Sequence, residues 1–190
     1  MNRKFAATPA LACIALVNGQ FATAAVLDAA PGGFTIENVI TVPVDANAAW
    51  RALVNDVDAW WPKDHTWWGP ASKLSIDARA GGCFCETTAT QQAEHMQVVF
   101  VDPGKLLRMS GGLGPLQGMG LGGVLEWRIA GTEGGTRITL WYRAGGYSTD
   151  DLGKFAPVVD SVQALQLGGL GDWLTRQSST PPKPPELAVQ

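Results

Sequence analysis

The feature that most constrains this fold is a run of strand-like segments that no helical pattern interrupts. Six segments between residues 73 and 144 are rich in strand formers or alternate between apolar and polar residues, with turn signals between them. Parallel strands would need helical crossovers, so strands that follow one another directly predict an antiparallel sheet. The expected strands are residues 34–42, 73–79, 83–88, 94–101, 105–110, 124–129 and 137–144.

Two helical patterns flank this run and complete an α+β fold. Asp45 is positioned to cap a short helix in which Trp50, Leu53 and Val57 recur at helical spacing. Residues 152–176 form a longer periodic segment. A long helix against a curved antiparallel sheet can leave a cavity between the two layers. We expect one domain over residues 34–177, preceded by a linker over residues 25–33.

The chain ends differ in composition from this domain. Arg3 and Lys4 precede a short apolar run over residues 10–17, and Ala22 and Ala24 fit a small-x-small cleavage site. This pattern predicts a signal peptide over residues 1–24 and a periplasmic or secreted protein. The alternatives are an uncleaved N-terminus and lipidation at Cys13. Residues 178–190 carry four prolines and are expected to form a disordered tail.

Charge and cysteine content limit the possible partners. Only 16% of residues are charged and the net charge is −3, which excludes a basic nucleic-acid surface. The apolar run is too short to span a bilayer. Cys83 and Cys85 stand two apart on an expected strand, where their Cβ atoms would lie roughly 6–7 Å apart. We therefore expect free thiols.

Two motifs of the chain resemble cofactor sites. Residues 118–123 satisfy G-x-G-x-x-G, but an alternating strand pattern follows where a dinucleotide site needs a helix. We expect a flexible loop near the mouth of a pocket instead. Cys83, Cys85, Glu86 and His95 include possible zinc ligands, yet Cys-x-Cys on a strand chelates poorly. We predict neither a metal nor a cofactor.

Several stretches together resemble the START-like, helix-grip superfamily. They are VPVDANAAWRALVND, DAWWP, ARAGGCFCE, VDPGKLLRMS, GGTRITLWY and the terminal helix, and the nearest branch is that of the heat-shock-protein ATPase activator homologues. The resemblance covers residues 34–175. It implies a seven-stranded sheet gripping a long C-terminal helix around an apolar pocket that takes lipids, steroids, polyketides or aromatics. An exported protein would not meet the cytosolic chaperone, so no chaperone partner is expected.

A carboxylate and a histidine are the strongest candidates for chemistry in that pocket. If the hairpin turns at residues 89–92, Glu86 faces His95 and Phe84 faces Gln97 across the two strands. A buried carboxylate beside a histidine is how a general base is built. In the alternative register, Cys83, Cys85, Met96, Val98 and Phe100 face inward. Glu86 and His95 would then form a solvated pair on the surface.

Aromatic residues are the candidates for lining the pocket. Trp60 and Trp61 belong to residues 58–70, which contain four Trp residues and are called the Trp segment below. This segment acts either as a lid over the cavity or as an aromatic plug in the core. The family resemblance implies that Phe84 points into the space between the sheet and the long helix. Alternation turns Trp127 and Tyr142 inward, and the Tyr hydroxyl could orient a ligand.

Two functions from different classes remain. The first is binding of a small apolar or aromatic ligand, lipid-like or polyketide-like, by these aromatic residues. The second is a cyclase- or hydrolase-type enzyme in the same cavity, with His95 as general base and Glu86 orienting it. No Ser nucleophile elbow is present in the sequence, which favours binding.

Overall fold

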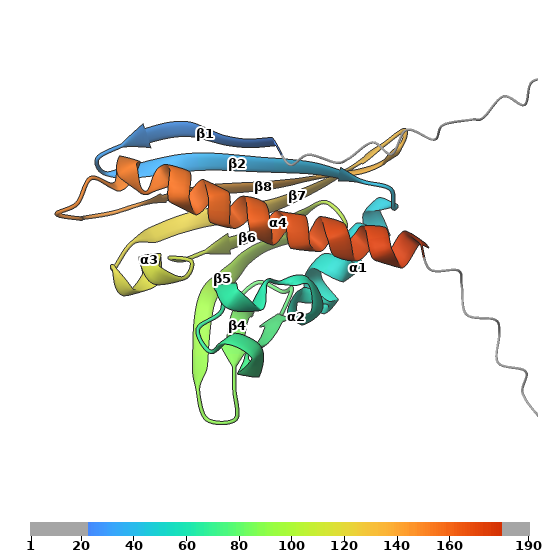
Figure 1. The fold of residues 1–190 in the computed structure, drawn as a ribbon, viewed down its shortest axis with the longest axis horizontal. Helices are drawn as coiled ribbons and strands as arrows, with labels where there is room; N and C mark the ends of the chain where they lie inside the picture. The colour runs from blue at the N-terminus through green and yellow to red at the C-terminus, as the bar shows by residue number, and fades with distance from the viewer. Residues whose placement is uncertain (1–22, 180–190) are drawn as a thin grey trace, which may run out of the picture.

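A computed structural model describes residues 23–179 as a curved, fully antiparallel eight-stranded sheet with one long helix on its concave side (Figure 1). The strand order is β1-β2-β8-β7-β6-β5-β4-β3. The strands are β1 (Thr23–Ala30), β2 (Gly33–Val42), β3 (Lys73–Ile76), β4 (Cys83–Thr87), β5 (Gln92–Asp102), β6 (Leu106–Ser110), β7 (Gly122–Thr132) and β8 (Gly135–Gly145). The helices are α1 (Ala46–Asn55), α2 (Val57–Trp60), α3 (Pro115–Gly118) and α4 (Ala156–Ser179), with short 3-10 turns η1 (Lys63–His65), η2 (Gly69–Ala71) and η3 (Leu152–Lys154).

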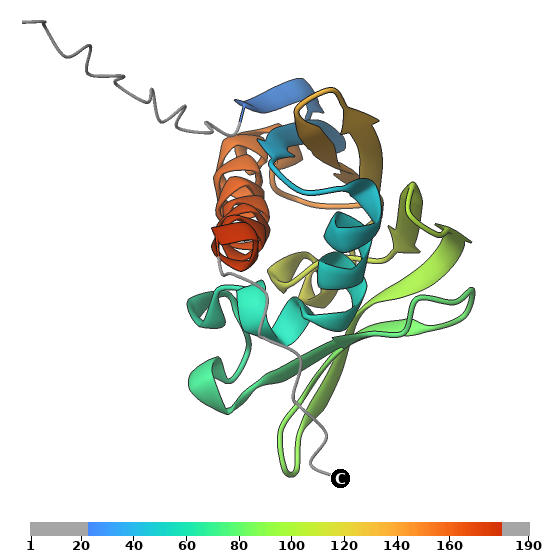
Figure 2. The same ribbon diagram turned by 90° about the vertical axis from the view of Figure 1, so that its right-hand side faces the viewer.

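The two expected helices form where the sequence predicts them. The Asp45 side chain accepts a hydrogen bond from the Ala48 N–H at 2.9 Å and caps α1. The C-terminal segment opens with η3 and then continues as α4, which packs along β2 and β1 and reaches α1 and α2. Figure 2 looks close to the axis of α4 and shows the sheet curving around it. The expected α+β, helix-grip fold is confirmed.

The core between the helix and the sheet is aromatic and aliphatic. Trp127 of β7 and Tyr142 of β8 both point inward and are almost fully buried. Trp60 meets Trp127 edge to face at 5.8 Å between ring centroids, and Phe34 meets Tyr142 at 6.3 Å. Alternation along β7 and β8 therefore identified the inward face correctly.

Strand β1 lies where a linker over residues 25–33 was expected. It pairs antiparallel with β2 and forms one edge of the sheet, which gives eight strands rather than about seven. The side chains of residues 26–30 are exposed, Val26 and Leu27 among them, so this part of the edge strand has no buried face to impose an alternating pattern. The expected cleavage after Ala24 would remove only the first two residues of β1. The rest of the signal segment and residues 180–190 lie outside the described residues.

The pairing of β4 with β5 differs from the expected register. Phe84 lies opposite Met96, whereas Glu86 lies opposite Ala93, so the pairing shifts by one residue at His95. This shift is a β-bulge: one extra residue is accommodated in β5, and a bulge re-aims the side chains next to it. The expected register, with Glu86 directly across from His95, was wrong.

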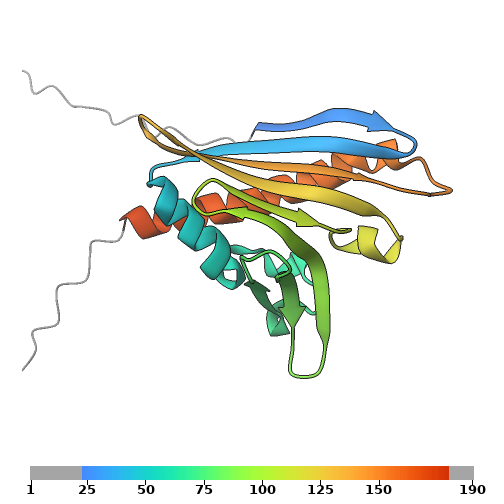
Figure 3. The ribbon, with the colours of Figure 1, turned by 180° about the vertical axis from the view of Figure 1, so that it is seen from behind.

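The bulge lets two adjacent residues of β5 face the interior. His95 and Met96 are both buried, and so is Val98 beyond them. A regular strand would have buried only alternate residues, so the two registers considered from the sequence each describe one side of the bulge. The hairpin of β4 and β5 extends away from the flatter part of the sheet (Figure 3).

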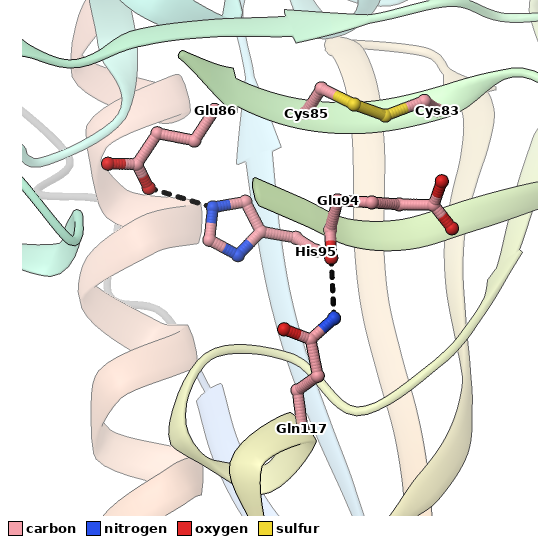
Figure 4. Close-up of a disulfide and its surroundings, with 6 residues drawn as sticks. All are labelled: Cys83, Cys85, Glu86, Glu94, His95 and Gln117. Carbon is pink, nitrogen blue, oxygen red and sulfur yellow. Dashed lines mark hydrogen bonds and ion pairs between the residues drawn. A yellow bond between two sulfur atoms is a disulfide. The ribbon is translucent and has the colours of Figure 1, made fainter. Parts of the chain in front are cut away.

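Cys83 and Cys85 form a disulfide, so the prediction of free thiols was wrong (Figure 4). Their Cα atoms are 5.4 Å apart, inside the range that a disulfide accepts, because β4 is less extended here than an ideal strand. Both cysteines are half-buried on the face opposite to Phe84 and Glu86.

Candidate functional site

A cavity of about 460 Å³ opens between α4, the segment that carries η1, the loop around α3, and β5. Its lining is mostly apolar, and a volume of this size suits a small organic molecule. Four parts of the chain line the cavity. Helix α4 and the residue before it contribute Phe155, Val158, Val159, Val162, Gln163 and Gln166, and the segment around η1 contributes Trp61, Asp64, His65, Thr66 and Trp67. The α3 loop contributes Leu113, Gly114, Pro115, Leu116 and Met119, and β5 contributes His95.

The expected carboxylate–histidine pair borders this cavity. Nε2 of His95 lies 2.8 Å from Oε2 of Glu86, and both side chains are buried (Figure 4). The second oxygen, Oε1, accepts hydrogen bonds from the Ser72 hydroxyl at 2.5 Å and from the backbone N–H groups of Trp67 and Trp68 at 2.9 and 3.3 Å. Both oxygens of Glu86 therefore accept hydrogen bonds, and two of these bonds connect the Trp segment to β4.

These contacts set the ionisation of Glu86. Burial by itself raises the pKa of this carboxyl, but the hydrogen bonds from Ser72, Trp67 and His95 outweigh it and lower the pKa below its ordinary value. An ionised Glu86 accepts the Nε2–H of His95, which assigns the proton of a neutral ring to Nε2. With Nε2–H directed at Glu86, the lone pair of a neutral ring lies on Nδ1, and His95 lines the cavity.

The Trp segment divides between the cavity and the core. Trp61 lines the cavity and donates its Nε1–H to the His65 carbonyl at 3.0 Å. Trp67 also lines it and is 47% exposed, at the rim. Trp60 lies in the core instead, where its Nε1–H donates to the Ala52 carbonyl at 3.0 Å.

Of the five residues expected to bind ligand, Trp61 is the one that lines this cavity. Trp60, Phe84, Trp127 and Tyr142 lie in the buried core and are not among its lining residues. Their faces were predicted correctly, but an inward face can be filled by neighbouring side chains. Phe84, for example, packs against the rings of Trp61 and His95, each at 5.1 Å between centroids.

Tyr142 acts on the cavity through the loop before α3. Its hydroxyl accepts the Leu113 N–H at 3.2 Å and donates to the Gly111 carbonyl at 3.4 Å. Burial raises the pKa of this phenol, so the hydroxyl stays protonated and able to donate. Gln117 fastens the same loop by donating to the Glu94 carbonyl at 2.5 Å. The loop from Gly111 to Met119, which carries α3, thus forms a wall of the cavity and is held by β8 and β5.

Two residues that line the cavity were not predicted from the sequence. Gln163 and Gln166 are buried on α4, and neither oxygen of their amides has a hydrogen-bond partner in the described residues. The signal for them was present, because both stand in the apolar stripe that also contains Val159, Val162 and Leu170. A polar residue at such a position is informative because buried polar groups are usually partnered.

Residues 23–179 contain no group of three or more His, Cys, Asp and Glu side chains placed to hold a metal ion. Within the same range, no helix combines the length and the apolar character that crossing a membrane requires.

Comparison with known proteins gives a fold relationship. The sequence matches no protein-family profile and no curated protein. Among solved structures, a protein from Nitrosomonas europaea matches with a TM-score of 0.53 and 19% identity over 77% of this chain and 97% of its own. A protein from Mesorhizobium loti matches with a TM-score of 0.52 and 17% identity, over 75% of this chain and 97% of its own. A protein from Rhodobacter sphaeroides matches with a TM-score of 0.54 and 12% identity, over 82% of this chain and 99% of its own. At these identities the likeness shows a shared fold and leaves the ligand to be argued from the cavity.

Proposed function

We propose that this domain binds a small, largely apolar or aromatic molecule, lipid-like or polyketide-like, in the cavity beside α4. The observation that carries the proposal is a mostly apolar cavity of about 460 Å³ with a few polar groups, which is typical of ligand sites. Membership of the START-like superfamily belongs to the same proposal. The α+β helix-grip fold and the sequence stretches quoted above support it.

Filling the cavity tests the proposal. Val162 lines the cavity from α4, whereas Leu165 lies on the exposed side of the same helix and does not line it. Val162→Trp should abolish saturable, roughly 1:1 binding of a neutral apolar dye such as N-phenyl-1-naphthylamine, and Leu165→Trp should leave it unchanged. Circular dichroism checks that both variants are folded. Equal binding by both variants would place the dye elsewhere and count against the proposal, as would a wild-type protein that binds no dye.

A second candidate is an enzyme that works in the same cavity, favoured by the Glu86–His95 pair. The pair is buried and joined at 2.8 Å, and His95 lines the cavity, so in its neutral form it would serve as the base toward a bound molecule. An ester or polyketide-like substrate is the chemical class that such a base would serve. Turnover that disappears in His95→Ala while ligand binding survives would establish the enzyme. If no turnover of esters or polyketide-like compounds is found in the wild type, binding alone remains.

We also propose that the protein works in the periplasm or is secreted. The Cys83–Cys85 disulfide supports this, because disulfides persist in oxidising compartments. Protein recovered from the periplasm or medium of the native host should begin at about Ala25. An intact Met1 on that material would contradict the export proposal.

A further inference from the structure

Polar atoms without partners concentrate at the cavity. Five buried side-chain nitrogen or oxygen atoms in residues 23–179 have no hydrogen-bond partner, and four of them belong to cavity residues. These four are both amide atoms of Gln163, Oε1 of Gln166 and Nδ1 of His65. The fifth, Oδ1 of Asn38, lies under α4 away from the cavity, and its own amide nitrogen donates to Asp160 at 3.0 Å.

Such a concentration needs an explanation, since the great majority of buried polar groups find partners. Gln163 is 1% exposed and Gln166 is 4% exposed, so bulk solvent does not satisfy their amides. The two residues stand three apart on α4 and so lie on one face of the helix, beside the apolar side chains of Val159 and Val162. Because both residues line the cavity, a molecule bound there can supply the groups that complete these amides.

We infer that the ligand carries a neutral hydrogen-bonding group, a hydroxyl or an amide, on an otherwise apolar body, and that Gln163 and Gln166 bind this group. The inference rests on the proposed binding function and specifies its ligand class. A primary amide offers a donor and an acceptor side by side, which matches a hydroxyl or an amide better than a group that only accepts.

The charges around the cavity favour a neutral group over an anionic one. No lysine or arginine of the described chain is among the cavity-lining residues, whereas Asp64 is. Glu86 lies directly behind His95 with its pKa lowered, so it brings a negative charge close to the site. A carboxylate or phosphate would enter without a guanidinium or ammonium partner, and burying an unpaired charge is costly. A neutral hydroxyl loses much less on leaving water.

Three probes with the same ring system separate these possibilities. Isothermal titration calorimetry at neutral pH would compare naphthalene, 2-naphthol and 2-naphthoate, which are apolar, neutral with a hydroxyl, and anionic. The wild type should bind 2-naphthol about tenfold more tightly than naphthalene, the gain expected from one well-formed hydrogen bond, and should bind 2-naphthoate most weakly.

Two variants on the same helix connect that preference to the amide. Gln163→Leu should bind naphthalene at least as well as the wild type and lose the preference for 2-naphthol. Gln177→Leu makes the same chemical change at an exposed position near the end of α4, and it should keep the preference. Gln166→Leu serves as a second test in case Gln163→Leu does not fold.

The outcomes distinguish a failure of this inference from a failure of the proposed ligand-binding function. Equal binding of naphthalene and 2-naphthol by the wild type, or tightest binding of 2-naphthoate, overturns the inference and leaves a cavity that binds apolar molecules. A preference for 2-naphthol that survives in both Gln163→Leu and Gln166→Leu also overturns it. Failure of all three probes to bind the wild type counts against the proposed function itself.

Discussion

At the scale of single residues, the cavity combines apolar side chains with amides that lack partners in the ligand-free protein. An unsatisfied buried amide lowers the stability of the folded state, because folding removes it from water and returns no hydrogen bond. Gln163 is such a residue, with both amide atoms buried and unpartnered. A position that lowers stability while it lines a cavity is typical of a functional residue.

Replacing this amide should stabilise the ligand-free protein. We expect Gln163→Leu to raise the free energy of unfolding by about 1–3 kcal/mol, the range for removing an unsatisfied buried polar group. Chemical denaturation of the protein freed of bound molecules measures it. Gln177→Leu, at an exposed site of the same helix, should change stability by less than about 0.5 kcal/mol. A destabilised Gln163→Leu would mean that its amide already has a partner.

At the scale of elements, the α3 loop owes its position to the strands beneath it. Gly123 of β7 permits this arrangement, because a Cβ there would lie 2.8 Å from Cε2 of Tyr142. The last glycine of the G-x-G-x-x-G motif thus serves the packing of β8. The strand β7 begins at Gly122, where a dinucleotide site would need a helix.

Tyr142→Phe should loosen that loop without disturbing the sheet. The change leaves the Leu113 N–H without its partner, and we expect a loss of about 1 kcal/mol of stability. The Leu113 amide should also exchange with deuterium faster, whereas the amides of β8 should not. Tyr147→Phe is the matched control, because Tyr147 is 89% exposed. Unchanged exchange at Leu113 would show that the hydroxyl does not hold the loop.

The elements also show where the sequence was sufficient. Strong alternation located β7 and β8 and their inward faces, and an apolar stripe located α4. Edge strand β1 was missed because a strand with little burial has little pattern, and the bulge at His95 was missed because one extra residue leaves no mark in composition. Trp127 and Tyr142 were predicted to face inward, but only the packed structure separates a residue that fills the core from one that borders a cavity.

At the scale of the whole molecule, three carboxylates join parts of the chain that are distant in sequence. Glu86 links β4 to β5 and the Trp segment, and Glu126 of β7 accepts hydrogen bonds from Arg108 and Arg128 at 2.6 and 2.7 Å. Asp58 accepts from Lys63 at 2.6 Å and from the Leu74 N–H at 2.8 Å. The tertiary structure is therefore coupled to the ionisation of these groups.

The direction of that coupling follows from their pKa values. In each case burial raises the pKa, but the partners outweigh it, so Asp58, Glu86 and Glu126 all have pKa values lowered in the folded protein. A carboxyl whose pKa is lower in the folded state releases its proton more readily there than in the unfolded chain. Its contribution to stability is fully present above the unfolded-state pKa and is lost as the pH falls through the folded-state pKa.

The protein should therefore lose stability steadily on acidification below roughly pH 5, where unfolded carboxylates begin to bind protons. Urea unfolding at a series of pH values measures the loss. In Glu86→Gln and in Glu126→Gln the stability should be lower at pH 7, and the further drop on acidification should be smaller, because one proton-linked contribution is gone. Glu133→Gln, at the exposed β7–β8 turn, should reproduce the wild-type drop. If the Glu86 and Glu126 variants followed the wild-type pH curve in parallel, these two carboxylates would not be the source of the acid sensitivity.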